Sequence, residues 1–266
     1  MKIARTIAVV FILLTRVVAA NAAEPWDSLT PGAPTRVVDI VDGDTVVIEP
    51  PIDGAREIRL VGIQAPKIPL GRKDFKAWPY GELAKSTLAT LLQDKDVTLY
   101  YGGQSMDRHG RLLAHLRRTD GLWIQGELLR LGMARVYSFP DNRAVADQML
   151  TAEQSARDLR QGIWRHPFYN LRIPEEAGKF IGRFEVVQGT VMDVAEKGSN
   201  FYVNFGADWR TDFTLTINGK ARRLFREAAF DPLSLKGKTM RVRGWLKSYN
   251  GPMIAISHPE QIEVLD

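Results

Sequence analysis

The sequence predicts an α+β protein made of two small β-barrels that carry helices. Short segments rich in β-branched residues alternate with Gly, Pro and Asp turns in both halves of the chain, which is typical of antiparallel strands. Each half also contains an amphipathic helical segment after its third predicted strand. A connector containing proline and glycine, residues 166–182, separates the halves. We therefore expect one domain over residues 35–165, a linker, and a second domain over residues 183–266.

In the first half, three strands precede the first helix. They are expected at residues 37–41, 45–49 and 57–63, with Asp42-Gly43-Asp44 as a tight hairpin turn between the first two. Leucines at helical spacing predict a helix over residues 82–93. Strands at 97–101 and 111–117 and helices at 123–131 and 144–160 complete the set. This order matches an oligonucleotide-binding (OB) barrel capped by three helices.

The second half repeats the order of elements. Strands are expected at residues 184–194, 199–205 and 212–217, followed by a helix at 220–229 and strands at 239–247 and 252–256. We therefore expect a second OB-like barrel. Alternation over residues 199–217 places six apolar side chains in its core: Phe201, Val203, Phe205, Phe213, Leu215 and Ile217.

The first 22 residues have the layout of a signal peptide. Lys2 and Arg5 precede an apolar run that extends to residue 15, and a tail of small residues ends at Ala22. The run is too short to span a bilayer, so a retained anchor is the weaker alternative, and no later segment is apolar enough to cross a membrane. We expect the mature chain to be exported, to the periplasm or by secretion.

The basic charge of the chain is not spread evenly. The net charge is +5, but residues 1–22 contain three basic residues and no acidic ones. Residues 23–177 contain 20 basic and 21 acidic residues, and residues 178–266 contain 13 basic and 10 acidic residues. The near-neutral first domain gives no general argument for a nucleic-acid partner, so only local patches can. The absence of cysteine excludes thiolate metal sites and a cysteine nucleophile, and the four histidines lack the spacing of a zinc site.

Two patches combine cations with aromatic residues, which suits single-stranded nucleic acid. The loop over residues 68–81 contributes Arg72, Lys73, Lys76 and Trp78. On the predicted strand at 239–247, alternation turns outward Arg241, Arg243 and Trp245. The alternatives are a loop whose aromatic residues pin it to the body, and an edge strand whose cations keep it soluble.

Four short segments of the first half carry a resemblance to a known family: DGDT at residues 42–45, IRLVGI at 58–63, DRHGRLLA at 107–114 and QGIW at 161–164. Over residues 35–165 the chain resembles the staphylococcal nuclease (thermonuclease) family. The resemblance implies phosphodiester cleavage with one calcium ion, an activated water and two arginines on the phosphate. It further implies that Asp44 is a calcium ligand with Asp42 beside it, that Arg59 and Arg111 hold the phosphate, and that Asp107 orients the loop of Arg111.

The chain departs from the family pattern after the third strand, where it reads Gln64-Ala65-Pro66-Lys67. Gln64 replaces a carboxylate ligand of the metal by a neutral amide, whereas Ala65 still offers its carbonyl oxygen. Lys67 stands where the family has the glutamate that activates the water. An ammonium group about 6 Å from a divalent ion costs roughly 5 kcal/mol at an effective dielectric constant near 20. Both calcium binding and hydrolysis are therefore in question.

Three functions follow, and we favour the first. In it, Lys67 occupies the place of the metal, paired with Asp44 and Asp42, and the pocket binds single-stranded DNA or RNA without cutting. In the second, a relocated acid or base supports calcium-dependent cleavage, the candidates being Glu82, Asp74 and His109. In the third, the pocket is vestigial and the protein binds protein or glycan in the cell envelope. The alternative without function is that the acids only form the hairpin turn and the arginines only make surface ion pairs. No feature indicates an oligomeric state.

Overall fold

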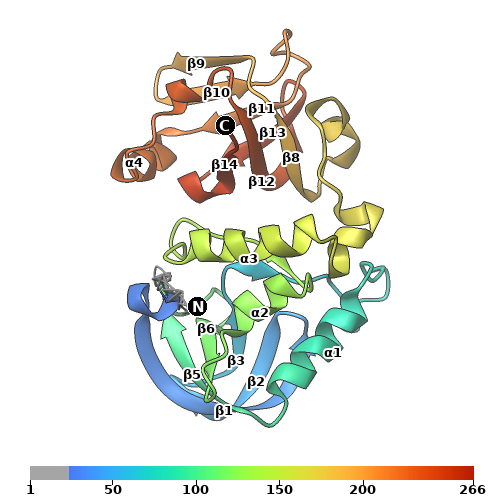
Figure 1. Cartoon of the computed structure of the whole chain (residues 1–266), viewed down its shortest axis with the longest axis vertical. Coiled ribbons are helices and arrows are strands. Elements are labelled where there is room, and N and C mark those ends of the chain that lie inside the picture. The colour runs from blue at the N-terminus through green and yellow to red at the C-terminus, as the bar shows by residue number, and fades with distance from the viewer. Residues whose placement is uncertain (1–23) are drawn as a thin grey trace, which may run out of the picture.

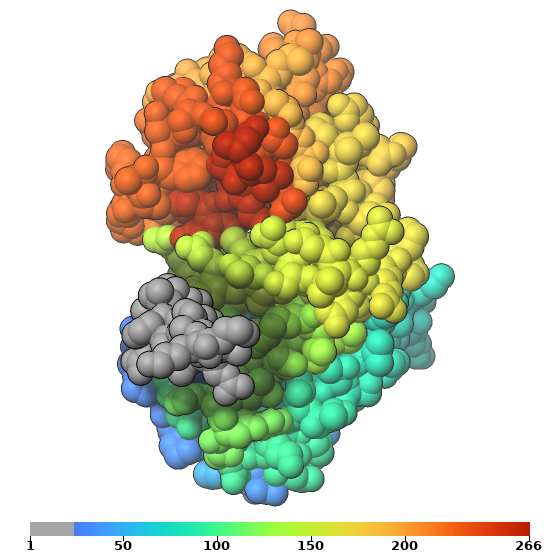
Figure 2. Space-filling model, viewed as in Figure 1, coloured from blue at the N-terminus to red at the C-terminus, as the bar shows by residue number. Residues whose placement is uncertain are grey.

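The computed structural model describes residues 24–266 as two bodies stacked along the long axis of the molecule (Figure 1). The predicted signal peptide lies outside the described residues. Helix α3 (Ala146–Asp158) belongs to the first body and forms the layer that faces the second (Figures 1 and 2). Among the described residues, no helix has both the length and the apolar character needed to cross a bilayer.

The first body is a closed five-stranded barrel in the order β1-β2-β3-β6-β5. Its strands are β1 (Thr30–Asp42), β2 (Thr45–Ile52), β3 (Ala55–Leu60), β5 (Asp96–Tyr101) and β6 (Leu112–Arg118). Neighbouring strands are antiparallel, except that β3 and β6 are parallel. Alternate side chains such as Val46, Ile48, Ile58 and Leu60 are completely buried inside the barrel.

Helices α1 (Gly81–Leu92), α2 (Ile124–Arg130) and α3 complete the first body (Figure 1). Ala84, Leu88 and Leu92 are buried at helical spacing, which explains why α1 packs on the barrel. The short strands β4 (Ile63–Gln64) and β7 (Arg135–Val136) pair beside the barrel. The 3-10 helices of this part and of the connector are η1 (Pro25–Ser28), η2 (Gly162–Arg165), η3 (Pro167–Tyr169) and η4 (Pro174–Phe180).

The second body is built on a seven-stranded sheet. Its elements are β8 (Phe184–Thr190), β9 (Asp193–Lys197), β10 (Asn200–Asn204), β11 (Thr214–Ile217), α4 (Gly219–Glu227), η5 (Pro232–Leu235), β12 (Thr239–Ser248), β13 (Pro252–Ile256), η6 (Pro259–Gln261) and β14 (Ile262–Val264). The sheet runs β14-β12-β13-β11-β10-β9, and β8 pairs with β12. The single strand predicted at 184–194 is divided: β8 pairs with β12, and β9, which begins at Asp193, pairs with β10.

The two bodies therefore share one strand order. The parallel pair β11–β13 repeats the parallel pair β3–β6, and α4 follows the third strand as α1 does. The predicted α+β class is confirmed, the second body holds a second sheet, and the six apolar side chains expected in its core between residues 201 and 217 are buried.

One prediction about the second body is wrong. Arg243 was expected to point to solvent, but its side chain is only 1% exposed. Its Nη1 lies 3.0 Å from Glu153 Oε2 of α3, and its Nη2 lies 3.0 Å from Glu153 Oε1 and 2.5 Å from Glu263 Oε1. The Arg243 guanidinium of the second body thus pairs with the Glu153 carboxylate of the first, and both are buried because α3 covers this face of β12.

The side chains of Arg241 and Trp245, which flank Arg243 on the same face of β12, also make hydrogen bonds within the protein. Trp245, which is 41% exposed, donates from Nε1 to the hydroxyl oxygen of Tyr137 at 3.0 Å. Arg241 Nε donates to Gln188 Oε1 at 2.8 Å. These three side chains do not form the open platform for single strands that strand alternation suggested.

Candidate functional site

Asp44 is the centre of the polar cluster at the β1–β2 hairpin. Its carboxylate is fully buried. Oδ1 lies 2.9 Å and Oδ2 2.8 Å from Lys67 Nζ, and Oδ2 also accepts from Ala65 N at 2.8 Å. Arg59 Nη2 lies 3.2 Å from Oδ2. Two cations and one backbone amide thus surround a single carboxylate.

The hairpin reaches this position because Gly43 has no side chain. A Cβ atom at Gly43 would lie 2.7 Å from the Cβ of Ala65 and 2.8 Å from the Cβ of Ala84 on α1. Such distances are too short for carbon atoms, so only glycine permits the turn to pack against both segments. This packing brings Asp44 to Lys67.

Asp42 completes the cluster in a less favourable setting. Its Oδ1 accepts from Asp44 N at 3.0 Å, and its Oδ2 lies 3.6 Å from Lys67 Nζ. Burial and the neighbouring Asp44 charge raise the pKa of Asp42 above its usual range, and Lys67 only partly opposes them. Burial also tends to raise the pKa of Asp44, but the charges of Arg59 and Lys67 outweigh it and hold the pKa below its ordinary value. Asp44 is therefore the ionised partner of Lys67.

Arg59 is turned inward. Its Nη2 donates to Ile63 O at 2.6 Å, and its Nη1 donates to the carbonyl oxygens of Asp44 and Leu60. The guanidinium thus holds the strand end together, although the resemblance assigned it to a phosphate.

Gln64 lies apart from the cluster. Its Oε1 accepts from Arg135 Nε at 3.2 Å and from Arg135 Nη2 at 2.9 Å, so the side-chain oxygen proposed as a metal ligand is engaged elsewhere. Arg135 was not anticipated from the sequence. It is buried, its guanidinium lies 4.7 Å from the ring of Phe184 and 5.9 Å from that of Trp78, and burial lowers its pKa to about 10.

The loop patch over residues 68–81 is partly structural. Trp78 packs on Phe168 with ring centroids 5.6 Å apart. Arg72 donates from Nε to Pro69 O and from Nη2 to Ile68 O, both at 2.9 Å. Lys73 and Lys76 are exposed.

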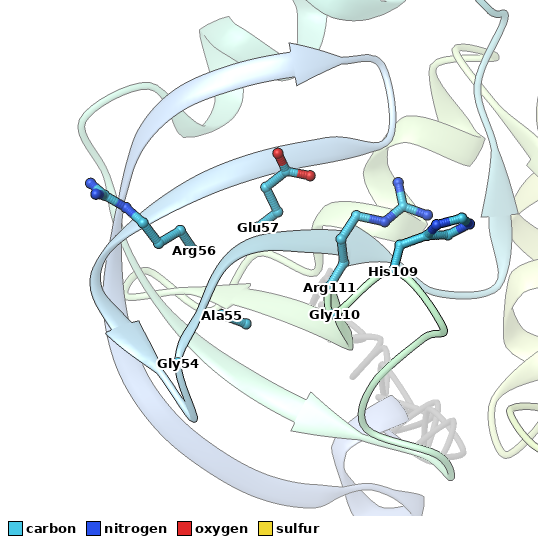
Figure 3. A pocket seen from close by; sticks show the side chains of 7 residues that line it. All are labelled: Gly54, Ala55, Arg56, Glu57, His109, Gly110 and Arg111. Atoms are coloured by element: carbon cyan, nitrogen blue, oxygen red, sulfur yellow. The ribbon is translucent and has the colours of Figure 1, made fainter.

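Arg111 lies in a separate hollow of about 640 Å³ beside β3, which Glu57 and His109 also line (Figure 3). Asp107 holds it there: Oδ2 accepts from Arg111 Nη2 at 2.7 Å and from Nε at 2.9 Å, and Oδ1 accepts from His109 N at 2.8 Å. Burial tends to raise the pKa of Asp107, but these hydrogen bonds hold it below its usual range. In Figure 3, Arg111 lies between Glu57 and His109, whereas Arg56 points away.

The hollow and the hairpin cluster are neighbours through β3. Glu57 and Arg59 are two residues apart on this strand, so their side chains leave it on the same face. Arg59 does not line the hollow, however. Of the two arginines expected to share a phosphate, Arg111 therefore lies in the hollow and Arg59 lies in the hairpin cluster.

The residues do not fit a calcium ion. Calcium takes six to eight hard oxygens, whereas here an ammonium group sits within 2.9 Å of both carboxylate oxygens of Asp44. In residues 24–266, no three His, Cys, Asp or Glu side chains are placed to hold a metal together. Asp74 and Glu82, the acids considered as replacements, are exposed on the loop and on the first turn of α1.

Known proteins resemble the first domain in sequence. The family model described as staphylococcal nuclease homologue matches residues 57–166. An uncharacterized endonuclease of Escherichia coli O157:H7 is 30% identical over 139 residues, 52% of this chain and 82% of that protein. The thermonuclease of Staphylococcus hyicus is 27% identical over 130 residues, 48% of this chain and 74% of that protein. Endonuclease YhcR of Bacillus subtilis (strain 168) is 30% identical over 181 residues, 65% of this chain but only 14% of that much longer protein.

Proposed function

Because this chain belongs to the staphylococcal nuclease family, we propose that its first domain binds the phosphodiester backbone of nucleic acid without hydrolysing it. The observation that carries the proposal is the contact of Lys67 Nζ with both oxygens of Asp44 at 2.8 and 2.9 Å. The ammonium group takes the position beside Asp44 that a metal ion would need.

The electrostatic cost of restoring a metal supports this proposal. A calcium ion about 4 Å from the ammonium group would be repelled by roughly 8 kcal/mol at an effective dielectric constant of 20. Lys67 would have to leave its buried partner to avoid that repulsion. The side chain at the position of the family's glutamate is an ammonium group in contact with Asp44, and an ammonium group has no lone pair with which to deprotonate a water.

The cations Arg111, Lys73 and Lys76 of the first domain are accessible to the phosphates of a nucleic-acid backbone. Arg111 is about one-third exposed and is held in a fixed orientation by Asp107. Lys73 and Lys76 lie on the exposed loop that follows Lys67. A phosphate at Arg111 would be held by a charge-assisted contact, and the loop lysines would add attraction that salt screens.

Fluorescence anisotropy with labelled single-stranded DNA and RNA tests the proposal, with calcium and with chelator. We expect binding that salt weakens, that chelator leaves unchanged, and that Arg111→Ala reduces. Arg36→Ala is the matched control, because Arg36 is an exposed arginine whose ion pair, within residues 24–266, is with the exposed Asp96. Absence of binding at low salt contradicts the proposal and leaves the protein- or glycan-binding alternative in the cell envelope.

A second candidate is calcium-dependent cleavage by a relocated group. It is favoured by one observation, namely that His109 lies beside Arg111 in the hollow, where it could serve a phosphate held by that arginine (Figure 3). Gel electrophoresis of the same substrates decides between the two. Cutting that chelator stops and that both His109→Ala and Asp44→Ala abolish supports the enzyme.

We also propose that the mature protein is exported. The arrangement of basic, apolar and small residues over residues 1–22 supports this. Mass spectrometry of the secreted and periplasmic fractions tests it, and a chain that begins at Ala23 is the expected product.

A further inference from the structure

The second domain has a groove on the outer face of the sheet formed by β9, β10, β11 and β13. Its volume is about 340 Å³. Tyr202, Asn204 and Thr214 lie on its floor, Trp209 and Tyr249 line it from two loops, and Lys197 lies at one side. In Figure 1, β9 and β10 lie at the end of the second body that is remote from α3. The groove is therefore distinct from the site of the first domain and from the interface between the bodies.

We propose that this groove binds a short stretch of single-stranded nucleic acid. The proposal stands independently of the function proposed for the first domain.

The floor is polar yet deeply recessed. On β10 the side chains of Phe201 and Val203 are buried in the barrel, so Tyr202 and Asn204 point outward, and Thr214 is paired opposite Asn204 on β11. Despite their outward direction, Asn204 and Thr214 are only 9% and 7% exposed. Outward polar groups of a surface sheet are buried to this degree only where the surrounding segments rise above them.

Asn204 offers a directional group at this depth. Its Oδ1 accepts from Thr214 Oγ1 at 3.1 Å, which orients the amide and leaves its NH2 group for a ligand. A nucleobase edge supplies the acceptor oxygens and ring nitrogens that such a donor needs. Desolvated polar groups of this kind give a pocket its orientation and specificity.

The walls supply stacking surfaces. Trp209 is 49% exposed on the β10–β11 loop, and Tyr249 is 64% exposed at the β12–β13 turn. Large exposed aromatic residues that line one polar groove are unfavourable in water without a partner. Stacking with bases uses these faces without requiring a particular base.

Charge favours nucleic acid over a neutral oligosaccharide. Lys197 Nζ and the guanidinium of Arg210 lie 5.5 and 5.1 Å from the ring of Trp209, so two cations accompany the main stacking residue. The acidic residue of the groove, Asp193, is paired with Lys236 at 2.8 Å. Residues 178–266 contain 13 basic and 10 acidic residues, so the body as a whole attracts an anionic strand.

The test measures binding of labelled oligo-dT and oligo-rU to the full chain from residue 23 onward. To lower the contribution of the first domain, every variant is made in an Arg111→Ala background. We expect Trp209→Ala and Tyr249→Ala each to weaken binding about tenfold, and Lys197→Ala to reduce its salt dependence. Met192→Ala and Lys220→Ala are controls with exposed side chains in the same body, and their affinity should not change.

Hydrogen–deuterium exchange locates the ligand. Oligonucleotide should protect residues 205–213 and 249–251. Unchanged affinity in Trp209→Ala and Tyr249→Ala, together with no protection of these two segments, overturns the proposal. Protection of them by neutral oligosaccharides but not by oligonucleotides also overturns it, whereas failure of the first-domain site alone changes neither result.

Discussion

Reversal of the charge at Lys67 tests how the hairpin cluster is stabilised. In Lys67→Glu, an attraction over 2.8 Å to Asp44 and 3.6 Å to Asp42 becomes a repulsion. Each pair of unit charges at about 4 Å is worth roughly 4 kcal/mol at an effective dielectric constant of 20. The Lys67 side chain is about one-quarter exposed and can relax into water, so we expect a loss of about 3–5 kcal/mol, the range for breaking a buried pair.

The same substitution should create a response to calcium. The variant has three neighbouring carboxylates, and calcium at 100 times its Kd would restore about 2.7 kcal/mol. Urea denaturation of the wild type and the variant, in calcium and in chelator, measures both effects. Lys67→Met should be destabilised without a calcium response, and Lys73→Glu, on the exposed loop, should show neither effect.

An equal calcium response in the wild type and in Lys67→Glu would refute this reasoning. So would a variant that keeps wild-type stability in chelator, because the ammonium group would then contribute nothing to the buried Asp44.

Three further outcomes are expected. Glu153→Gln should lower the free energy of unfolding by about 3–5 kcal/mol and expose the segment between the bodies to proteases, because Arg243 loses its buried partner; Glu227→Gln, a surface exchange, should do neither. Gly43→Ala should destabilise by about 1–3 kcal/mol, seen as a lower Tm, whereas Gly178→Ala, which meets no atom within 4 Å, should not. Burial, with the charge of Arg143, lowers the pKa of His258 from 6.5 to about 4, so the neutral form is favoured on folding. The associated stability is complete above pH 6.5 and is lost as the pH falls toward 4. Urea denaturation between pH 6.5 and pH 4 measures this change, and the free energy of unfolding of His258→Gln should fall by about 3 kcal/mol less than that of the wild type over this range.

The sequence was sufficient where local patterns carry the information. Period-two alternation identified the buried residues of β10 and β11, and the Asp-Gly-Asp turn identified the first hairpin. The order of strands and helices predicted the α+β class, because an OB-like barrel is specified by that order and by short connections. The meeting of Lys67 with Asp44 also followed, since family positions imply a common strand end.

Side-chain directions in the site were less predictable. Gln64 was aligned with a metal ligand, yet it bonds to Arg135, a residue 71 positions later in the chain. Arg59 was aligned with a phosphate ligand, yet it bonds to main-chain carbonyls around it. An aligned position states where a backbone lies, whereas the choice among rotamers depends on which partners the folded chain brings within reach.

By itself, the amino-acid sequence determined the α+β class, the apolar core positions of β10 and β11, and the exchange of a carboxylate for an amine at position 67. Only the tertiary structure decided that Arg243 is buried against Glu153 and that Trp209 and Tyr249 face one groove. The physical reason is the range of the interactions. Alternation along a strand is a property of adjacent residues, but whether an outward face meets water or another body depends on segments that are distant in the chain.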